Sequence, residues 1–151
     1  WLNICGEPVG QAWDENRLLD AETGSIIVIL ATDAPLGPLA LRHLAKRAAI
    51  GIGRGGTPGG NNSGDIFLAF SVANPQPMPQ SAGPETTRVE LNGEYIDPLY
   101  LAAVEAVEES VLNAMVAAED VPTVKPPNKT CSALPVERLR AHFSPGQDAA
   151  Q

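Results

Sequence analysis

The stretch SIIVILATDAPLGPLALRHLAKRAAIGIGR, residues 25–54, decides how the chain folds. Its first part, residues 25–32, is dense in β-branched and aliphatic side chains on both faces of an extended chain, which is typical of a strand covered on both sides. Small and aliphatic residues then recur at helical spacing, at Leu41, Leu44, Ala45 and Ala48. We therefore expect a core strand followed by an amphipathic helix, which Gly51 and Gly53 end.

The rest of the chain alternates between short apolar segments and Gly- and Pro-rich breaks. A glycine-rich loop leads into a second expected strand, DIFLAFSVA, residues 65–73. The segment 74–87 has too many prolines and too few bulky side chains to pack, so we expect an exposed loop. Four further elements are expected: a hairpin around CGEPVG (residues 5–10), a short strand near RVEL (residues 88–91), a helix at 98–118 whose N-cap is Asp97, and a short helix within PVERLRAHF (residues 135–143).

Length and composition limit the classes of protein to which the chain can belong. With 151 residues, 44% of them hydrophobic, it suits one globular domain with a core of useful size. Its formal net charge of -8 would repel a phosphate backbone, so nucleic acid is not an expected partner. No apolar run in the sequence approaches the about 20 residues that span a bilayer, so a membrane is not expected either. Since the sequence begins with Trp1 rather than Met, it does not show whether a targeting peptide precedes it, and our expectation is a cytoplasmic protein.

The sequence offers little for a metal or a cofactor. Cys5 and Cys131 lie far apart without a CxxC spacing, and His43 and His142 are isolated, so neither a zinc site nor a Ser-His-Asp triad is indicated. GIGRGG, residues 51–56, matches the GxGxxG pattern of dinucleotide-binding loops. That pattern needs a strand before it and a helix after it, whereas here a helix precedes and a loop follows. We therefore expect no metal and no cofactor.

The start of the first expected strand is unusual, because strand formation asks for neither Gly24 nor Ser25. A Gly-Ser bond in a strained turn can be attacked by the serine hydroxyl at the glycine carbonyl, and hydrolysis of the resulting ester leaves Ser25 as a new N-terminus. Glycine suits this position because it leaves the carbonyl unshielded. The released α-amine, with an unperturbed pKa of about 7.7 to 8.0, can act as general base for the hydroxyl of the same residue. Such a nucleophile needs no histidine.

A second polar segment, NNSGD at residues 61–65, stands at the start of the other expected strand, and ordinary turn chemistry would account for it as well as for Ser25. However, the segments 23–54 and 61–74 together resemble the region around the self-cleavage site of the DmpA-type aminopeptidases, which comprise L-aminopeptidase D-amidase/D-esterases and β-peptidyl aminopeptidases. The resemblance covers essentially residues 22–75. It implies an α+β fold that forms part of the family's four-layer αββα sandwich, and a precursor that cuts itself before Ser25.

The resemblance also implies how the chain and its site are divided. Residues 1–24 would be the C-terminal tail of an α-chain, and residues 25–151 a whole β-chain with Ser25 as the nucleophile. The polar pair that supports the nucleophile in the family falls on Ser63 and Asp65. The latter is often glutamate in relatives, so this chain has a shorter carboxylate of the same charge. The family's oxyanion-hole asparagine and substrate-contacting tyrosine belong to the preceding part of the α-chain, so this chain alone carries half an active site.

The function implied by the resemblance is an N-terminal serine amidohydrolase, self-cleaved between Gly24 and Ser25, that releases N-terminal amino acids from peptides, amides or esters. Its expected partners are a substrate with a free amino group, the α-chain of the same precursor, and further αβ units in a tetramer. Ser63 would hydrogen-bond the nucleophile, while Asp65 would orient Ser63 or, by charge, the ammonium of Ser25 or of the substrate. Two alternatives remain: an endoamidase of the nylon-oligomer type, against which serine rather than threonine at position 25 argues, and an uncut, non-catalytic structural or interaction module.

Overall fold

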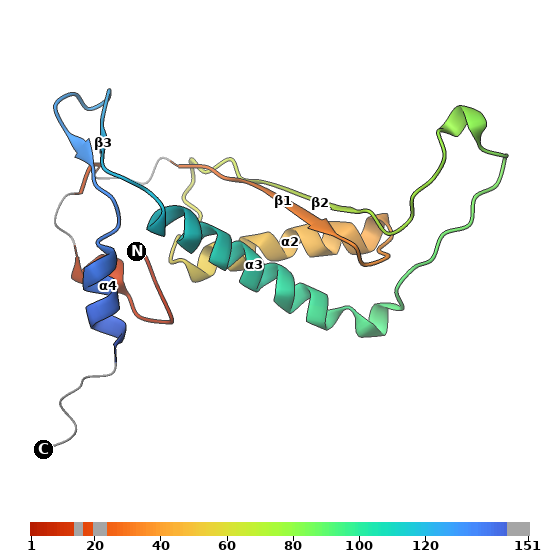
Figure 1. Cartoon of the computed structure of the whole chain (residues 1–151), viewed down its shortest axis with the longest axis horizontal. Helices are drawn as coiled ribbons and strands as arrows, with labels where there is room; N and C mark the ends of the chain where they lie inside the picture. Colours follow the sequence, from red (N-terminus) through yellow and green to blue (C-terminus); the bar gives the residue numbers. More distant parts are fainter. Residues whose placement is uncertain (14–16, 20–23, 145–151) are drawn as a thin grey trace, which may run out of the picture.

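A computed structural model describes residues 1–13, 17–19 and 24–144 of the chain. Its elements follow in the order α1 (Val9–Ala12), β1 (Ile27–Thr32), α2 (Pro38–Arg54), β2 (Ile66–Ser71), η1 (Pro79–Ser81), η2 (Gly93–Tyr95), α3 (Asp97–Val116), β3 (Val121–Pro122), β4 (Thr130–Cys131) and α4 (Val136–Phe143), where η1 and η2 are short 3-10 helices. The body is elongated, and β1, β2, α2 and α3 form its central part (Figure 1). The expected α+β class is confirmed.

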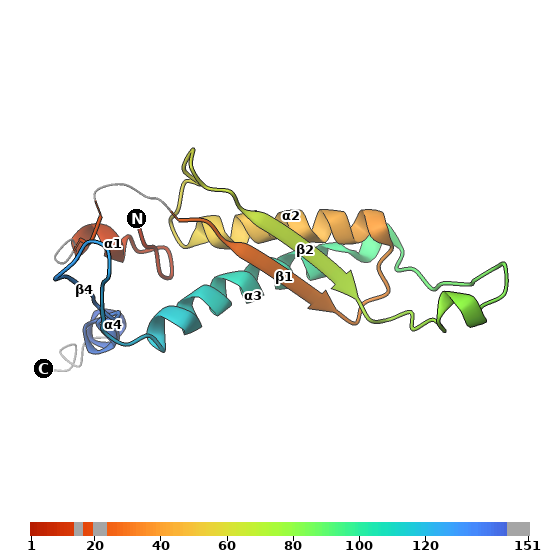
Figure 2. The ribbon, with the colours of Figure 1, turned by 90° about the horizontal axis from the view of Figure 1, so that it is seen from above.

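The central unit of the fold is a β1–α2–β2 crossover. β1 and β2 pair in parallel, with Ile27 opposite Ile66 and Thr32 opposite Ser71. A two-residue hairpin cannot join parallel strands, and α2 supplies the longer crossover that they need. Viewed from above, both strands run across α2 and α3 in the same direction (Figure 2). The two strands therefore begin at the same edge of the sheet.

The two faces of this sheet have different environments. Toward the helices, Leu30 and Ala69 pack against a core cluster of Leu36, Leu44 and Ala103. On the other face, large apolar side chains are more than half exposed, namely Ile27 (68%), Ile29 (61%), Ile66 (58%) and Leu68 (52%). The expectation of a strand covered on both sides is thus met on one face within the part of the chain that the structure describes, because α2 and α3 lie on the same side.

Helix α2 continues through the glycines that were expected to end it. Gly51 is buried, and a Cβ atom at this position would lie 2.7 Å from the carbonyl oxygen of Val104 and 2.8 Å from Cβ of Val107. Glycine at position 51 therefore allows α3 to approach the backbone of α2. The prediction that Gly51 and Gly53 end the helix is wrong, because close helix packing outweighs the low helix propensity of glycine.

The segment between β2 and α3 projects from one end of the body as a long loop that carries η1 near its tip (Figure 1). Residues 74–87 are largely exposed, as expected. Residues 88–91, all within the described part of the chain, do not form the expected strand. A side chain binds the backbone there instead, because the amide group of Asn74 donates to the carbonyl of Val89 over 3.1 Å and accepts from its N–H over 2.9 Å. Asn74 thereby uses the two groups that a neighbouring strand would have paired.

The expected N-cap of α3 is wrong, whereas the turn expected near the N-terminus is present. Asp97 is the first residue of α3 and not its N-cap, which is Ile96 without a side-chain hydrogen bond. Near the N-terminus, an antiparallel bridge between Ile4 and Glu7 closes a tight turn within the segment expected to form a hairpin, and the short helix α1 takes the place of its second strand. The turn places Cys5 at a φ of 52°, which is uncommon for a residue other than glycine.

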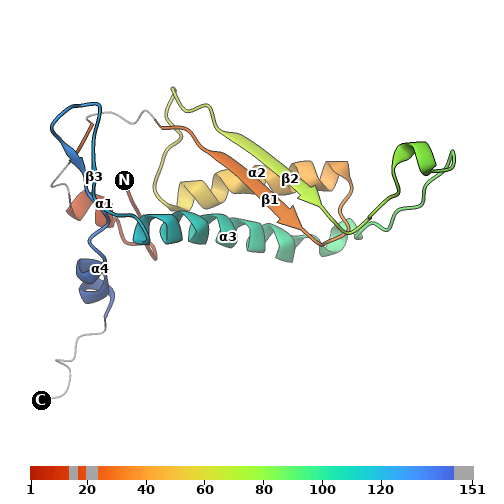
Figure 3. The ribbon, with the colours of Figure 1, turned by 45° about the horizontal axis from the view of Figure 1, so that its top comes forward.

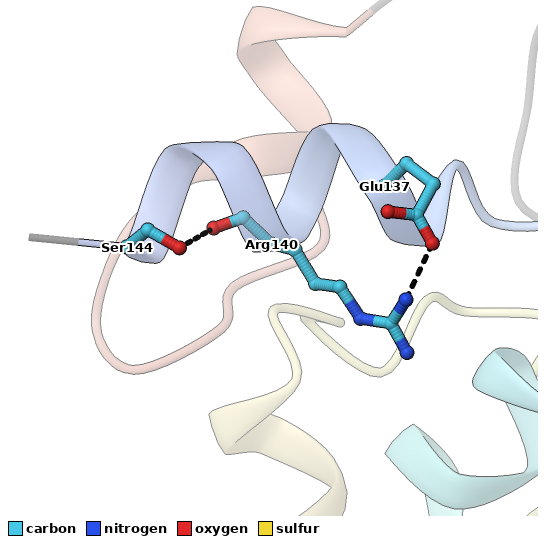
Figure 4. A network of polar contacts seen from close by, with 3 residues as sticks. All are labelled: Glu137, Arg140 and Ser144. Atoms are coloured by element: carbon cyan, nitrogen blue, oxygen red, sulfur yellow. Dashed lines mark hydrogen bonds and ion pairs between the residues drawn. The ribbon is translucent and has the colours of Figure 1, made fainter. Parts of the chain in front are cut away.

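The C-terminal part of the described chain consists of the small β3–β4 hairpin and α4, which confirms the short helix expected there. Glu137 and Arg140 form an ion pair one turn apart, and the Ser144 hydroxyl donates to the Arg140 carbonyl over 2.7 Å (Figure 4). Arg138 lies over the ring of Trp13 at 4.6 Å, which connects α4 to the N-terminal segment. Among the described residues, no helix is long and apolar enough to cross a membrane.

Candidate active site

Parallel pairing brings the starts of β1 and β2 together, and with them the two polar segments that precede the strands. Both arrows begin at the same end of the sheet (Figure 3). The Ile66 N–H donates to the Ile26 carbonyl over 3.0 Å, which begins the ladder directly after Ser25 and Asp65. Ser25 and Gly64, 39 positions apart in the sequence, are consequently in direct contact. The fold thus assembles the expected site residues at one edge of the sheet.

Ser25 is exposed at this edge, immediately before β1. Its Oγ atom accepts a hydrogen bond from the Gly64 N–H over 2.9 Å. Gly24 is exposed too, and a Cβ atom added to it would meet no atom within 4 Å outside its two chain neighbours. The backbone of Gly24 does not take a positive φ, and the strained turn at the Gly24–Ser25 bond stays a prediction. Residues 22 and 23 of the same segment lie outside the described residues.

Ser63 and Asp65 form a short pair beside Ser25. The Ser63 hydroxyl donates to Asp65 Oδ1 over 2.5 Å, and the same oxygen accepts the Ile26 N–H over 3.1 Å. Both contacts are partly buried. The contact expected between the two side chains is therefore present, while the catalytic roles of these residues stay predictions. The Ile26 N–H precedes the ladder of β1 and β2 and therefore needs an acceptor outside it. The Asp65 carboxylate is that acceptor, and it thereby holds the backbone one residue after Ser25.

The geometry supplies groups that acyl transfer uses. A hydroxyl stands at an exposed chain position, a backbone N–H contacts it, and a carboxylate fixes the adjacent backbone. Within the described residues, no group of three or more His, Cys, Asp or Glu side chains is arranged to hold a metal ion. His142 makes edge-to-face contacts with Trp13 and Phe143, and His43 lies exposed on α2, so neither joins the site. The arrangement is one in which an amide or ester carbonyl could be attacked by Ser25.

Sequence reasoning missed one group in this site, the backbone N–H of Gly64. A backbone donor leaves no mark in a residue pattern, since every residue except proline carries one. The signal that could have found it is the parallel register, because pairing of Ile27 with Ile66 places Ser25 and Gly64, each two positions earlier, beside each other. Such a register is fixed by the crossover helix and the packing of the sheet rather than by any local motif.

The sequence model of peptidase family S58 matches residues 1–128. The chain belongs to this family. Within S58, it is similar to the β-peptidyl aminopeptidase BapA of Sphingosinicella microcystinivorans, with 40% identity over 157 aligned positions that cover 93% of this chain and 39% of that protein. The resemblance to the DmpA-type aminopeptidases is thereby confirmed.

Solved structures of aminopeptidases are also similar to this chain. The L-aminopeptidase D-Ala-esterase/amidase of Ochrobactrum anthropi, described as a variant of the Ntn hydrolase fold, is 52% identical, with a TM-score of 0.85 over 93% of this chain and 38% of that one. A β-aminopeptidase from a Burkholderia species is 36% identical, with a TM-score of 0.77 over 96% of this chain and 41% of that one. The chain therefore has the fold of part of an Ntn hydrolase, and it spans about two fifths of the length of these relatives.

Proposed function

We propose that this chain carries the nucleophilic half of a self-processing aminopeptidase and amidohydrolase, with Ser25 as its N-terminal nucleophile. The observation that carries the proposal is the position of Ser25, exposed at the start of β1 with its Oγ held by Gly64 and with the Ser63–Asp65 pair alongside. Membership of family S58 supports the same activity. The relatives' names add aminopeptidase action on β-peptides and amidase or esterase action on D-alanine derivatives.

The first step of the proposed function is cleavage of the chain itself. Oγ of Ser25 adds to the carbonyl carbon of Gly24, the bond from that carbon to the Ser25 nitrogen breaks, and the hydroxyl proton passes to the released α-amine. Water then hydrolyses the ester, which leaves a carboxyl group on Gly24 and restores the Ser25 hydroxyl. The exposure of both Gly24 and Ser25 supports this step, because water can reach the residues on either side of the bond that breaks.

The second step is hydrolysis of a substrate by the mature serine. The free α-amine of Ser25 accepts the hydroxyl proton as Oγ attacks the substrate carbonyl, and the same proton goes to the leaving amine or alcohol. Water releases the acyl group from Ser25 in the reverse sequence of transfers. Asp65 holds the Ile26 N–H and the Ser63 hydroxyl, so it fixes the direction in which the nucleophile points and attracts the positive charge that develops on the amine.

The exposed apolar surface of this chain supports contact with further polypeptide chains. The apolar face with Ile27, Ile29, Ile66 and Leu68 is more hydrophobic than a solvent-facing sheet surface requires. An open cavity of about 470 Å³ also lies along β1, between the strand and α3. We assign both to contact with the α-chain of the same precursor, with residues 1–24 as its tail and residues 25–151 as the β-chain. Four such αβ units would form the tetramer.

The substrate class of the proposal is a peptide, amide or ester with a free amino group next to the scissile carbonyl. The relatives' names, with aminopeptidase in each of them, favour this class over internal cleavage of the nylon-oligomer type. Serine at position 25 supports the same choice.

Intact-mass measurement on the full-length precursor, combined with an aminopeptidase assay, tests the proposed function. We expect two fragments, the smaller beginning at Ser25, in protein that hydrolyses an amino-acid amide. A single uncut chain with full activity would contradict the proposal. An uncut chain without activity would instead support the non-catalytic structural module.

A further inference from the structure

The loop before β2 contacts the Ser25 hydroxyl through its backbone and not through either polar side chain. The Ser63 hydroxyl is directed to Asp65, and Asp65 reaches the chain at the Ile26 N–H. It is the N–H of Gly64, between these two residues, that donates to Ser25 Oγ over 2.9 Å. Among the residues of this loop, Gly64 thus contacts the oxygen that has to react.

We infer that the Gly64 N–H is a catalytic hydrogen-bond donor, which stabilises negative charge on Ser25 Oγ during both self-cleavage and substrate hydrolysis. The inference rests on the proposed function, because it assumes that Oγ is the nucleophile. Serine hydroxyls lose their proton with difficulty at neutral pH, so a group that stabilises the deprotonated oxygen lowers the barrier to attack. A hydrogen bond to a charged oxygen is about twice as strong as one to a neutral oxygen, so the hydrogen bond from Gly64 strengthens as the hydroxyl proton leaves.

The position of Asp65 explains how the donor is kept in place. Its carboxylate binds the Ile26 N–H over 3.1 Å, and the Ile66 N–H binds the Ile26 carbonyl over 3.0 Å. The segment after Ser25 is therefore fixed against the segment after Gly64 by two hydrogen bonds on neighbouring groups. A donor held in this way needs little reorganisation when charge appears on Oγ, which is the condition under which such donors contribute most.

Glycine at position 64 is not demanded by the backbone. Gly64 does not have a positive φ, and a Cβ atom built on it would lie 3.9 Å from Ser25 Oγ, an ordinary van der Waals contact. An exchange confined to the backbone of Gly64 therefore leaves the side-chain packing at this position unchanged. The matched control is the same amide-to-ester exchange at Gly83, which is exposed in the segment 74–87 beyond the opposite end of the sheet.

The test replaces the amide at position 64 by an ester in the full-length precursor, through incorporation of glycolic acid in place of Gly64. This exchange removes the N–H and adds no side chain. We expect self-cleavage and kcat for an amino-acid amide to fall about 100-fold, the size typical of losing one donor to a developing oxyanion, with KM nearly unchanged. The ester exchange at Gly83 is expected to stay within about threefold of the wild type in both rates.

The same ester replacement in Ser25→Cys protein distinguishes an effect on catalysis from a loss of folding. A thiol ionises far more readily than a hydroxyl, so in Ser25→Cys protein the same ester replacement should slow self-cleavage by less than about 10-fold. A purely structural effect would slow both backgrounds equally, and that result would overturn the inference. It would also be overturned by a Gly64 ester variant that cleaves at the wild-type rate, or by a Gly83 ester variant that loses as much activity as the Gly64 ester. A wild-type precursor that is neither cut nor active would overturn the proposed function and this inference with it.

Discussion

The two ends of the β1–β2 pair carry the same kinds of side chain in different surroundings. At the C-terminal end, Thr32 Oγ1 accepts the Ala34 N–H over 3.0 Å, and the Ser71 hydroxyl donates to the Ala34 carbonyl over 2.6 Å. At the N-terminal end, the Ser63 hydroxyl donates to a carboxylate, and Ser25 Oγ receives a backbone N–H.

The hydrogen bonds at the two ends of the sheet distinguish hydroxyls that stabilise the backbone from those available to react. Ser71 both donates to Ala34 and accepts the Ala73 N–H, so its oxygen satisfies the backbone of a turn. Ser25 is exposed, accepts a hydrogen bond from the Gly64 N–H, and directly follows an exposed glycine. Hydroxyls at one end of the sheet therefore stabilise turns, and we assign those at the other end to chemistry. The following variants test this contrast in the full-length precursor.

The largest effect is expected for Ser25→Ala. Loss of the hydroxyl removes the atom that forms both the ester and the acyl-enzyme, so self-cleavage and hydrolysis should fall by more than about 1,000-fold. Ser25→Thr and Ser25→Cys keep a nucleophile at the same position and should retain part of each activity. Gel analysis of cleavage and a spectrophotometric amidase assay measure both, and an active, cut alanine variant would count decisively against the account.

Asp65→Asn comes next in size. Asparagine keeps an oxygen for the Ile26 N–H but loses the charge, so turnover should fall by about 100-fold or more if the carboxylate acts electrostatically. Asp33→Asn, an exposed carboxylate directly after β1 at the opposite end, is the matched control and should leave turnover unchanged. Equal, small effects of the two variants on kcat would show that Asp65 merely fixes a turn.

Ser63→Ala should have an intermediate effect. It removes the hydroxyl that donates to Asp65 Oδ1 but leaves the carboxylate bound to the Ile26 N–H, so we expect a loss of about 10-fold in kcat, or about 1.4 kcal/mol in the barrier. Ser63→Thr retains the hydroxyl and should recover most of the rate. Steady-state kinetics on cut protein give the values, and a threonine variant no better than alanine would contradict a role for the hydroxyl.

The smallest effect on activity is expected for Ser71→Ala, at the other end of the sheet. Its hydroxyl bonds to the backbone of the turn that follows each strand, so cleavage and kcat should match the wild type. The free energy of unfolding should fall by about 0.5–1.5 kcal/mol, the usual contribution of such a hydrogen bond. Chemical denaturation of the full-length protein measures this change. Slow self-cleavage in this variant would remove the contrast between the two ends.

The sequence predicted much of the central unit, because its patterns are local. Two sequence patterns each report which side chains of one element are buried: the β-branched residues before Thr32, and the helical spacing from Leu41 to Ala48. The strand β1 and the helix α2 lie at these positions. Gly51 was misread because its contact with Val104 belongs to another helix, more than 50 positions away. A propensity-based prediction cannot include that contact.

The sequence allowed the residues of the candidate site to be named, but it did not allow the contacts between them to be predicted. Ser25 could be singled out because the hydroxyl and Gly24 have no use in starting a strand, and Ser63 and Asp65 through the family resemblance. Their meeting depends on parallel pairing, which requires the whole crossover to fold. The Gly64 N–H depends on the same register, so it was invisible before the strands were paired.

Trapping the acyl-enzyme tests the central claim most directly. Active protein is mixed with an amino-acid ester, quenched in acid during turnover, digested, and mapped by tandem mass spectrometry. We predict that the acyl group resides on residue 25, in a peptide whose first residue is Ser25. An acyl group on Ser63, Ser71 or any other residue, or an active protein whose peptides still span Gly24 and Ser25 uncut, would contradict the account.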